Sequence, residues 1–363
     1  MSKKFKSFCI TMSAIMILTG CRSAAPAADA TQSTTAAEAV ESTVAVEVQN
    51  TAASTEASAA SESTASVESP ESLLVEGAVP VTWEPSSEHL IIETDEAKEL
   101  YDRIKAEDYP SLEELKAHPV IKQIDSLSAY YIALYGKTSE IDTPERDQLR
   151  EDVLNEFLAI GSARTESTDP DTGRAKYVYD GPLKKNFEME LVLGLPASGK
   201  STRVTDPDSE ESQSFILDCD VIKELIPEYK ESHGCAADAV HMESVMIMDQ
   251  AIKNFTEGEL KGTNVIIPLV ASDYDSLMET YIKPFEDAGY NVRAKFVPCE
   301  VNVSMARNVA RELETGRIIN SAVVFSFGTK PEEVYDKLAP MLNKKGIPYG
   351  YDEEEEKELE NAA

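Results

Sequence analysis

Residues that could bind a phosphate group stand together near the middle of the chain. The stretch 194–201 reads Gly-Leu-Pro-Ala-Ser-Gly-Lys-Ser and matches the pattern Gly-x-x-x-x-Gly-Lys-Ser/Thr at every fixed position. In this pattern backbone N–H groups point at one anion, the lysine adds a positive charge near the β- and γ-phosphates, and the hydroxyl binds magnesium. A glycine turn that binds nothing is the alternative. The predicted nucleotide-binding residues are Gly194, Leu195, Pro196, Ala197, Ser198, Gly199, Lys200, Ser201 and Thr202.

A second apolar run ends in acidic residues. It covers 215–220 and reads Phe-Ile-Leu-Asp-Cys-Asp. Parallel strands present the residues at their carboxyl ends to the crevice that also holds a phosphate loop. A carboxylate placed there can accept the proton of an acceptor hydroxyl or hold magnesium. The alternative is that both acids only cap a helix at Val221.

The elements that must position these residues follow from the hydrophobic pattern. Short apolar runs, the strand candidates, alternate with stretches of helical spacing after residue 187; the runs are 189–193, 215–217, 265–267 and 292–297. Such alternation predicts an α/β fold, a P-loop NTPase-type parallel sheet covered on both faces by helices. Helical spacing over 94–160 predicts a small N-terminal helical subdomain, whose last helix starts at the cap sequence 142–145, Asp-Thr-Pro-Glu.

These residues together resemble the zeta-toxin family of phosphate-loop kinases. The resemblance covers 142–338 and also rests on 225–229 (Leu-Ile-Pro-Glu-Tyr), 240–244 (Val-His-Met-Glu-Ser) and 311–317 (Arg-Glu-Leu-Glu-Thr-Gly-Arg). It implies transfer of a phosphoryl group from ATP, with Mg²⁺, to a small-molecule hydroxyl, in the best-known members the 3′-hydroxyl of UDP-N-acetylglucosamine. One departure concerns the sugar-nucleotide pocket. The third strand of the family often ends in an acid followed by Gly-Thr, whereas 266–270 here reads Ile-Ile-Pro-Leu-Val.

The resemblance also implies roles for single residues. Lys200 would hold the transferred phosphoryl group, Asp220 would be the general base, and Arg311 and Arg317 would neutralise the charge that develops during transfer. We expect Arg317 to lie on a mobile loop just beyond a glycine. For the metal, the prediction is Ser201 together with Asp218.

Three further residues are weaker candidates. Arg307 stands four residues before Arg311 on the same helical face, and surface pairing with Glu312 or Glu314 is an equally good interpretation of it. His241 shares a helical stripe with apolar residues, which predicts a partly buried histidine with a hydrogen bond. Glu243 faces elsewhere on that helix and could reach substrate.

The N-terminus predicts export. Lysines at positions 3, 4 and 6 precede an apolar run over 8–18, which ends in Leu-Thr-Gly-Cys. This ending resembles the lipobox of bacterial lipoproteins, which implies lipidation at Cys21 and attachment to the outer face of the cell membrane. An ordinary signal peptide with a chance cysteine is the alternative. The expected organisation is a signal peptide (1–20), a disordered tether rich in Ala, Ser, Thr and Glu (21–75), the helical subdomain (81–165), the kinase domain (185–345) and an acidic tail (350–363).

Composition excludes several classes of partner. The 363 residues contain 66 acidic and 34 basic side chains, for a net charge of −32. Nucleic-acid backbones and anionic membrane surfaces are bound by basic patches, so neither is expected as a partner. Five cysteines without a Cys-x-x-Cys pair do not indicate a disulfide scaffold. The expected partners are ATP, a small-molecule acceptor and a membrane reached through Cys21; an antitoxin is left open.

Two other functions remain open at this level. One is a non-catalytic surface lipoprotein that binds a nucleotide or a sugar nucleotide. The other is a nucleotide-gated interaction module whose helical subdomain binds a partner. Export also conflicts with a need for ATP, which an imported or neighbouring substrate, another phosphate donor or a retained population inside the cell would resolve.

Overall fold

The computed structural model describes residues 69–85, 89–163, 183–200 and 213–342, together with the short paired strands β1 (Ser167–Thr168) and β2 (Ala175–Lys176). The predictions for the signal peptide, Cys21, most of the tether, Ser201, Thr202 and the acidic tail lie outside the described residues. Residues 70–73, within the range expected for the tether, form the 3₁₀ turn η1 (Pro70–Leu73), which contacts α3 (Pro119–Tyr135).

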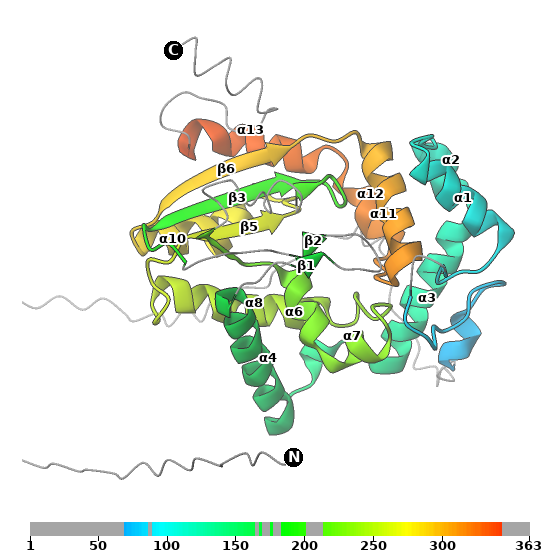
Figure 1. Cartoon of the computed structure of the whole chain (residues 1–363), viewed down its shortest axis with the longest axis horizontal. Coiled ribbons are helices and arrows are strands. Elements are labelled where there is room, and N and C mark those ends of the chain that lie inside the picture. The colour runs from blue at the N-terminus through cyan, green and yellow to red at the C-terminus, as the bar shows by residue number, and fades with distance from the viewer. Residues whose placement is uncertain are drawn as a thin grey trace, which may run out of the picture. The chain divides into compact units, whose positions relative to one another are not determined.

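A parallel sheet lies at the centre of the fold and confirms the predicted α/β class. Its strands are β3 (Glu188–Gly194), β4 (Phe215–Ile216), β5 (Val265–Leu269) and β6 (Asn291–Val297), in the order β4-β5-β3-β6. Leu191 of β3 pairs with Ile267 on one side and with Ala294 on the other. Because all the strands are parallel, their carboxyl ends point to the same edge of the sheet (Figure 1).

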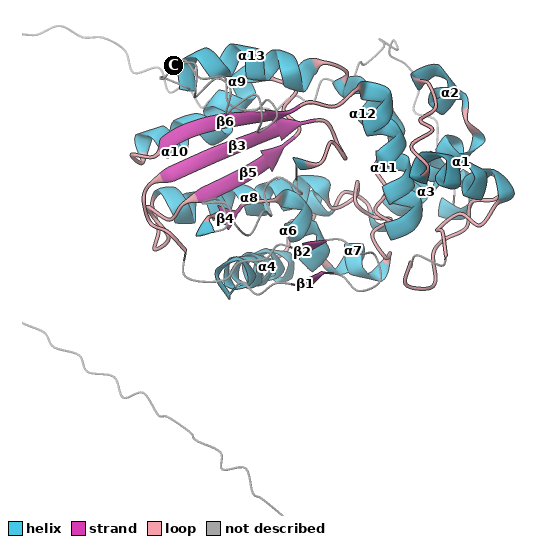
Figure 2. Ribbon diagram, turned by 45° about the horizontal axis from the view of Figure 1, so that its top comes forward, coloured by secondary structure: helices cyan, strands magenta, loops and turns pink. Residues whose placement is uncertain are grey.

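The two faces of the sheet differ in chemistry because side chains alternate along each strand. Met189, Leu191 and Leu193 are fully buried and share a core with α8 (His241–Thr256), α10 (Lys283–Asp287) and α13 (Lys330–Leu342). Burying each such side chain contributes about 1.5–3 kcal/mol. On the opposite face Glu190 pairs with Lys295 of β6 at 3.4 Å. Figure 2 shows α13 and α8 on either side of the strands in that view.

Among the described residues, four α-helices precede the sheet: α1 (Asp95–Lys105), α2 (Leu112–Ala117), α3 and α4 (Pro144–Ala163). The expected start of α4 is confirmed, since it begins at Pro144 and the Thr143 hydroxyl accepts a hydrogen bond from the Arg146 N–H at 3.2 Å. The shorter connecting elements before β5 are η2 (Thr138–Glu140), α6 (Cys219–Leu225) and α7 (Pro227–Glu231). Those after it are α9 (Tyr274–Leu277), a π-helical turn (Met278–Ile282), α11 (Val301–Thr315) and α12 (Ser321–Phe327).

A second hydrophobic core joins the N-terminal helices to α11. Leu100 of α1 and Leu127 of α3 are buried in the same cluster as Val309 and Leu313 of α11. The backbone adds to this contact, because the Ile91 N–H donates to the Leu313 carbonyl at 2.9 Å. The helical segment is therefore packed directly on the helix that carries Arg311. No helix within the described ranges is both long and apolar enough to cross a membrane.

Candidate phosphate-transfer site

The loop after β3 has the backbone of an anion-binding turn. Ala197 and Gly199 both have positive φ angles, 53° and 96°, with an ordinary residue between them. Such alternation turns successive N–H groups toward one side of the chain. At Gly194 a Cβ atom would lie 2.8 Å from Ser198 Oγ and 2.9 Å from the Val297 carbonyl oxygen, so any larger residue would push the loop off the sheet.

Lys200 closes this loop. Its Nζ donates to the carbonyl oxygens of Gly194, at 3.0 Å, and Leu195, at 2.6 Å. Burial and the nearby charge of Arg311 lower the pKa of Lys200 to about 8, against the opposing effect of Asp218. The amine is still mostly protonated at pH 7, and it is held by carbonyl groups that a phosphate could replace.

The loop fits a nucleotide polyphosphate with magnesium. Ser198 Oγ is buried and has no hydrogen-bond partner among the described residues, so it is a donor aimed into the loop. Ser198, Lys200 and the loop N–H groups would hold the phosphates. Within the described part of the chain no group of His, Cys, Asp and Glu side chains is arranged to hold a metal by itself. Asp218 and the predicted Ser201 would hold a magnesium ion together with phosphate oxygens, and the ion would supply charge neutralisation.

The acidic residues after β4 have different tasks. Asp218 is the N-cap of α6, and its Oδ1 accepts a hydrogen bond from the Asp220 N–H at 2.9 Å. The alternative that these acids cap a helix therefore holds for Asp218. The helix begins at Cys219, however, and not at Val221 as expected. Asp220 lies in the first turn of α6, where Lys223 Nζ contacts Oδ1 at 3.3 Å and Arg317 pairs with Oδ2.

Electrostatics keep Asp220 ionised. Burial by itself would raise the pKa of this carboxyl group, but the charges of Arg317, Lys223 and Arg311 outweigh burial and hold the pKa well below its usual range. Asp220 is therefore a carboxylate throughout the physiological pH range, in contact with the arginine that is expected to meet the transferred group.

The two candidate arginines reach the same site from α11 and the turn that follows it. Arg311 Nη2 donates to Asn308 Oδ1 at 2.5 Å, and Arg317 follows Gly316, the C-cap of α11, which has a φ angle of 71°. The charges of both arginines act on Lys200 and on Asp220. The structure thus brings together Lys200, Asp218, Asp220, Arg311 and Arg317.

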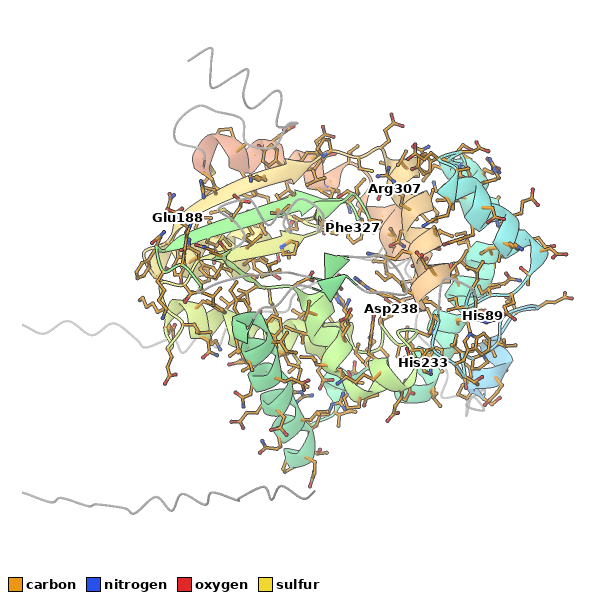
Figure 3. The ribbon with its side chains drawn as sticks, viewed as in Figure 1. His89, Glu188, His233, Asp238, Arg307 and Phe327 are labelled. Carbon is orange, nitrogen blue, oxygen red and sulfur yellow. The ribbon has the colours of Figure 1, made fainter. Side chains whose placement is uncertain are left out.

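Arg307 does not join this group. Its Nε donates to the Tyr109 hydroxyl at 3.2 Å, and its guanidinium lies 5.5 Å from the centre of the Tyr109 ring. Arg307 therefore pairs with Tyr109 and not with Glu312 or Glu314, the acids that the alternative interpretation gave as its partners. Figure 3 labels both Arg307 and Asp238 and shows that the two residues lie apart.

The two candidates on α8 also differ from expectation. Glu243 is 1% exposed, and its carboxylate accepts hydrogen bonds from Arg146 and Arg150 of α4 at 2.8 and 2.9 Å. Because this buried carboxylate is already bound by two arginines, Glu243 is not available to a substrate. His241 is exposed rather than partly buried. Desolvation by neighbouring protein atoms and the charge of Lys223 lower the pKa of His241 below its usual value, so its imidazole is neutral at pH 7.

Sequence reasoning missed one member of the site, Lys223, and did not foresee the burial of another, Ser198. Lys223 stands three residues after Asp220, and this spacing on a helix was a signal that could have identified it. Ser198 was included only as part of the loop, and nothing in the sequence indicates that its hydroxyl would be buried without a partner.

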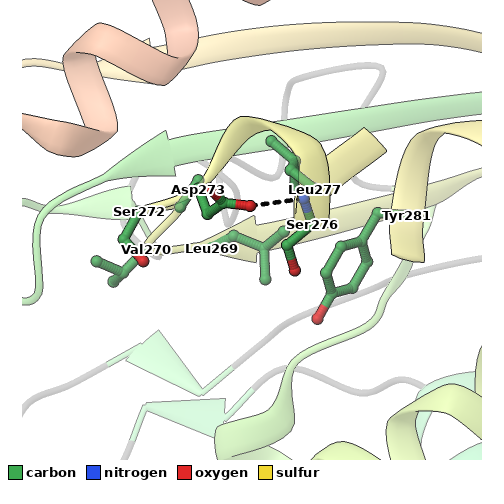
Figure 4. A pocket seen from close by; sticks show the side chains of 8 residues that line it. Leu269, Val270, Ser272, Asp273, Ser276, Leu277 and Tyr281 are labelled. Atoms are coloured by element: carbon green, nitrogen blue, oxygen red, sulfur yellow. Dashed lines mark hydrogen bonds between the residues drawn. The ribbon is translucent and has the colours of Figure 1, made fainter. Parts of the chain in front are cut away.

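A hollow of about 150 Å³ lies at the carboxyl end of β5, where the sequence departs from the family pattern. Figure 4 shows its lining, with apolar Leu269, Val270 and Leu277 beside the hydroxyls of Ser272, Ser276 and Tyr281. Asp273 caps α9 by accepting a hydrogen bond from the Ser276 N–H at 2.7 Å. Burial raises the pKa of Tyr281 well above its usual value, with a smaller effect from Cys219, which stands between the two acids of α6. Because β5 lies between β4 and β3, the hollow is at the same edge of the sheet as the phosphate loop after β3 and Asp218 after β4.

Comparison with known proteins agrees with this geometry. Residues 182–344 match the family model for Zeta toxin. The match runs from just before β3 to just after α13 and covers less than half of the chain. It includes every described residue of the phosphate-transfer site and indicates a kinase-like, nucleotide-binding segment. No curated protein matches the chain.

Two solved structures are similar at low identity. A chain from the PezAT chromosomal toxin–antitoxin system of Streptococcus pneumoniae is 14% identical, with a TM-score of 0.33; the match covers 46% of this chain and 62% of that one. A chain of the crystal structure of AvrRxo1-ORF1:AvrRxo1-ORF2 with sulphate ions is 16% identical, with a TM-score of 0.36, and the match covers 64% and 68% of the two chains. The chain thus spans less than two thirds of the PezAT chain that it matches.

Proposed function

We propose that this protein is a magnesium- and ATP-dependent phosphotransferase that transfers the γ-phosphoryl group of ATP to a hydroxyl of a small molecule. One observation carries the proposal. Lys200, Asp220, Arg311 and Arg317 come from separate segments of the chain, and their charges act on one another beside a phosphate-binding loop. Phosphoryl transfer depends mainly on positioning and charge stabilisation, which this group of residues can supply.

Each residue has a physical role in such a reaction. The N–H groups of the loop, Ser198 and Lys200 bind phosphate oxygens. Arg311 and Arg317 neutralise the charge that develops on the transferred group. Asp220 accepts the proton of the acceptor hydroxyl, and its ion pair with Arg317 keeps it ionised until then. A shift of Arg317 toward a phosphoryl oxygen would weaken that pair and make Asp220 a stronger base.

The acceptor that we propose is a hydroxyl of a nucleotide sugar such as UDP-N-acetylglucosamine. Support comes from the zeta-toxin match and from the hollow at the carboxyl end of β5, whose hydroxyl groups from Ser272, Ser276 and Tyr281 could bind a sugar or a base. The absence of an acid at 266–270 makes other hydroxyl acceptors worth including in any test.

The test is incubation with labelled ATP, magnesium and a panel of nucleotide sugars, with the products identified by mass spectrometry. We expect a phosphorylated nucleotide sugar from the wild-type protein. Lys200→Ala should lose most ATP binding in isothermal titration, because the charge that holds the phosphates is removed.

Asp220→Asn should lower turnover by about 10²- to 10⁴-fold, the usual range for general acid–base catalysis, with little loss of ATP binding. Asp102→Asn changes an exposed acid of α1 and is the matched control with unchanged turnover. Wild-type turnover in Asp220→Asn would reassign the base, with Asp218 the next candidate. ATP binding without transfer to any acceptor would instead favour the non-catalytic nucleotide-binding lipoprotein.

We also propose that Cys21 is lipidated and holds the protein on the outer face of the cell membrane. The Leu-Thr-Gly-Cys sequence and the basic, apolar segment before it support this proposal. Labelled fatty acid should be incorporated into the wild-type chain and not into Cys21→Ser. Because ATP is scarce outside the cell, the activity panel should include other phosphate donors.

A further inference from the structure

We propose that the N-terminal helical segment (residues 89–135, the front segment) is a working part of the phosphotransfer site, because α3 fixes the position of Arg317. This inference rests on the proposed function. It concerns the turn over residues 316–321 that carries Arg317, called here the arginine loop. The sequence suggested a mobile loop, whereas side chains from three segments of the chain hold its backbone.

Consecutive N–H groups of the arginine loop each donate to a different acidic side chain. The N–H of Ile319 donates to Glu312 of α11 at 3.0 Å, and that of Asn320 donates to Asp238 at 2.8 Å. The N–H of Ser321 donates to Asp125 of α3 at 2.7 Å, and the Ser321 hydroxyl donates to the second oxygen of the same carboxylate, also at 2.7 Å. Burial raises the pKa of Glu312 to about 8, so this carboxyl group is mostly protonated at pH 7 and its hydrogen bond is a neutral one. Hydrogen bonds to charged acceptors, such as the carboxylates of Asp238 and Asp125, are about twice as strong as neutral ones.

The front segment controls two of these three anchors. Asp125 belongs to α3, and Ser128, one turn later, donates its hydroxyl hydrogen bond to Asp238 Oδ2 at 2.6 Å. Ser128 is 1% exposed, so this bond is shielded from water. Figure 1 shows α3 beside α11 and α12, the two helices that the arginine loop connects.

Close backbone packing supports the same arrangement. Gly316 begins the loop, and a Cβ atom there would lie 2.4 Å from the His233 carbonyl oxygen. The turn that carries His233 also carries Asp238. The arginine loop is therefore confined between this turn and α3, with no room for a larger residue at its first position.

A buried side-chain relay connects the anchors to the second arginine. Glu312 Oε1, which accepts from the Ile319 N–H, also accepts from Asn308 Nδ2 at 2.9 Å. Asn308 Oδ1 in turn accepts from Arg311 at 2.5 Å. Arg311 and the arginine loop are thus oriented through one carboxyl oxygen, and a displacement of the loop would be transmitted to both arginines.

This arrangement predicts that α3 contributes to rate through position. Arg317 stands two residues before the first anchored N–H and must meet both Asp220 and the transferred group. A misplacement of about 1 Å at a catalytic group can cost about 10²-fold in rate. Asp125 and Asp238 are therefore positioning residues, which act through Arg317 and do not touch substrate.

The test compares kinetics of the full chain with and without the α3 anchor. Asp125→Ala should lower kcat by about tenfold to hundredfold while the Kd for ATP, measured by titration, stays within about twofold. Asp125→Asn keeps one acceptor oxygen and should recover part of the loss. Asp102→Ala on α1 removes an exposed acid and is the control with unchanged kcat.

A double-mutant cycle separates positioning from general loss of structure. In an Arg317→Ala background, Asp125→Ala should cause no further fall in kcat, because its target is already absent. Losses that multiply in the double variant, or a wild-type kcat in Asp125→Ala, would overturn the inference. If Asp125→Ala does not fold, Ser128→Ala carries the same cycle with a smaller expected loss. A wild-type protein without any transferase activity would overturn the proposed function itself, which is a different outcome.

Discussion

At the scale of single residues, the unusual feature is Lys200, a lysine whose pKa lies only about one unit above neutral pH. Burial and Arg311 bring the pKa of Lys200 to about 8, and the amine is bound by its own loop carbonyls. A bound polyphosphate would favour the protonated form strongly. Nucleotide binding should therefore be linked to proton uptake once the pH exceeds the pKa of the free site.

We predict that ATP affinity is constant below about pH 7.5 and falls by up to about tenfold per pH unit above pH 8, as Lys200 becomes neutral in the free protein. Lys200→Arg, whose guanidinium stays charged, should bind ATP with little dependence on pH over the same range. Isothermal titration in buffers of different ionisation enthalpy measures both affinity and proton uptake. An equally flat profile in the wild type would contradict the lowered pKa.

At the scale of elements, α4 is joined to the sheet-covering helices through buried charges. Arg146 donates to Glu243 of α8 at 2.8 Å and to Glu228 of α7 at 2.6 Å. Burial by itself would raise the pKa of Glu243, but the hydrogen bond from Arg146 outweighs it and the net shift is downward. The pair thus stabilises the fold above the unfolded-state pKa of glutamate, and this contribution is lost as the pH falls toward the pKa in the folded protein.

We predict that Arg146→Met lowers the free energy of unfolding by about 3 kcal/mol at pH 7, because it leaves the Glu243 charge buried with less compensation. Urea denaturation followed by circular dichroism measures this change. Arg103→Met removes a partly exposed arginine that pairs with Glu114 at 2.7 Å, and its effect should be far smaller. Equal shifts in the two variants would mean that the α4 ion pair contributes no more than a surface pair.

At the scale of the whole molecule, the front segment and the phosphate-binding segment share a hydrophobic core. Leu127 of α3 is fully buried in the cluster that includes Val309 and Leu313 of α11. If either segment unfolded, the apolar face of the other segment would be exposed to water. We therefore expect the two segments to unfold together.

We predict a single thermal transition for the described body of the protein, and a Leu127→Ala variant whose whole transition moves to lower temperature, with a cost of about 2–5 kcal/mol. Differential scanning calorimetry, with loss of ATP binding as a second probe, measures the change. Leu134→Ala on the same helix truncates a side chain that is 47% exposed and should change little. Two separate transitions, with only one moved by Leu127→Ala, would show independent segments.

The sequence alone determined the features that depend on neighbouring residues. The alternation of apolar runs predicted the parallel α/β sheet, the cap at Thr143 predicted the start of α4, and the glycine pattern predicted the phosphate loop. These features arise from backbone periodicity, local capping and local φ angles, all of which act over a few positions. Asp218 also obeyed local rules, because its side chain caps the helix that directly follows it.

Tertiary structure decided which charged residues meet. Asp220 pairs with Arg317, Glu243 is taken by two arginines of α4, Arg307 turns to Tyr109, and Asp125 fixes a loop far along the chain. No periodic or local pattern encodes such partners. Each contact is set by how the helices pack around the sheet and α11, so a charged side chain acquires its role only once the fold has brought its partner within hydrogen-bonding distance.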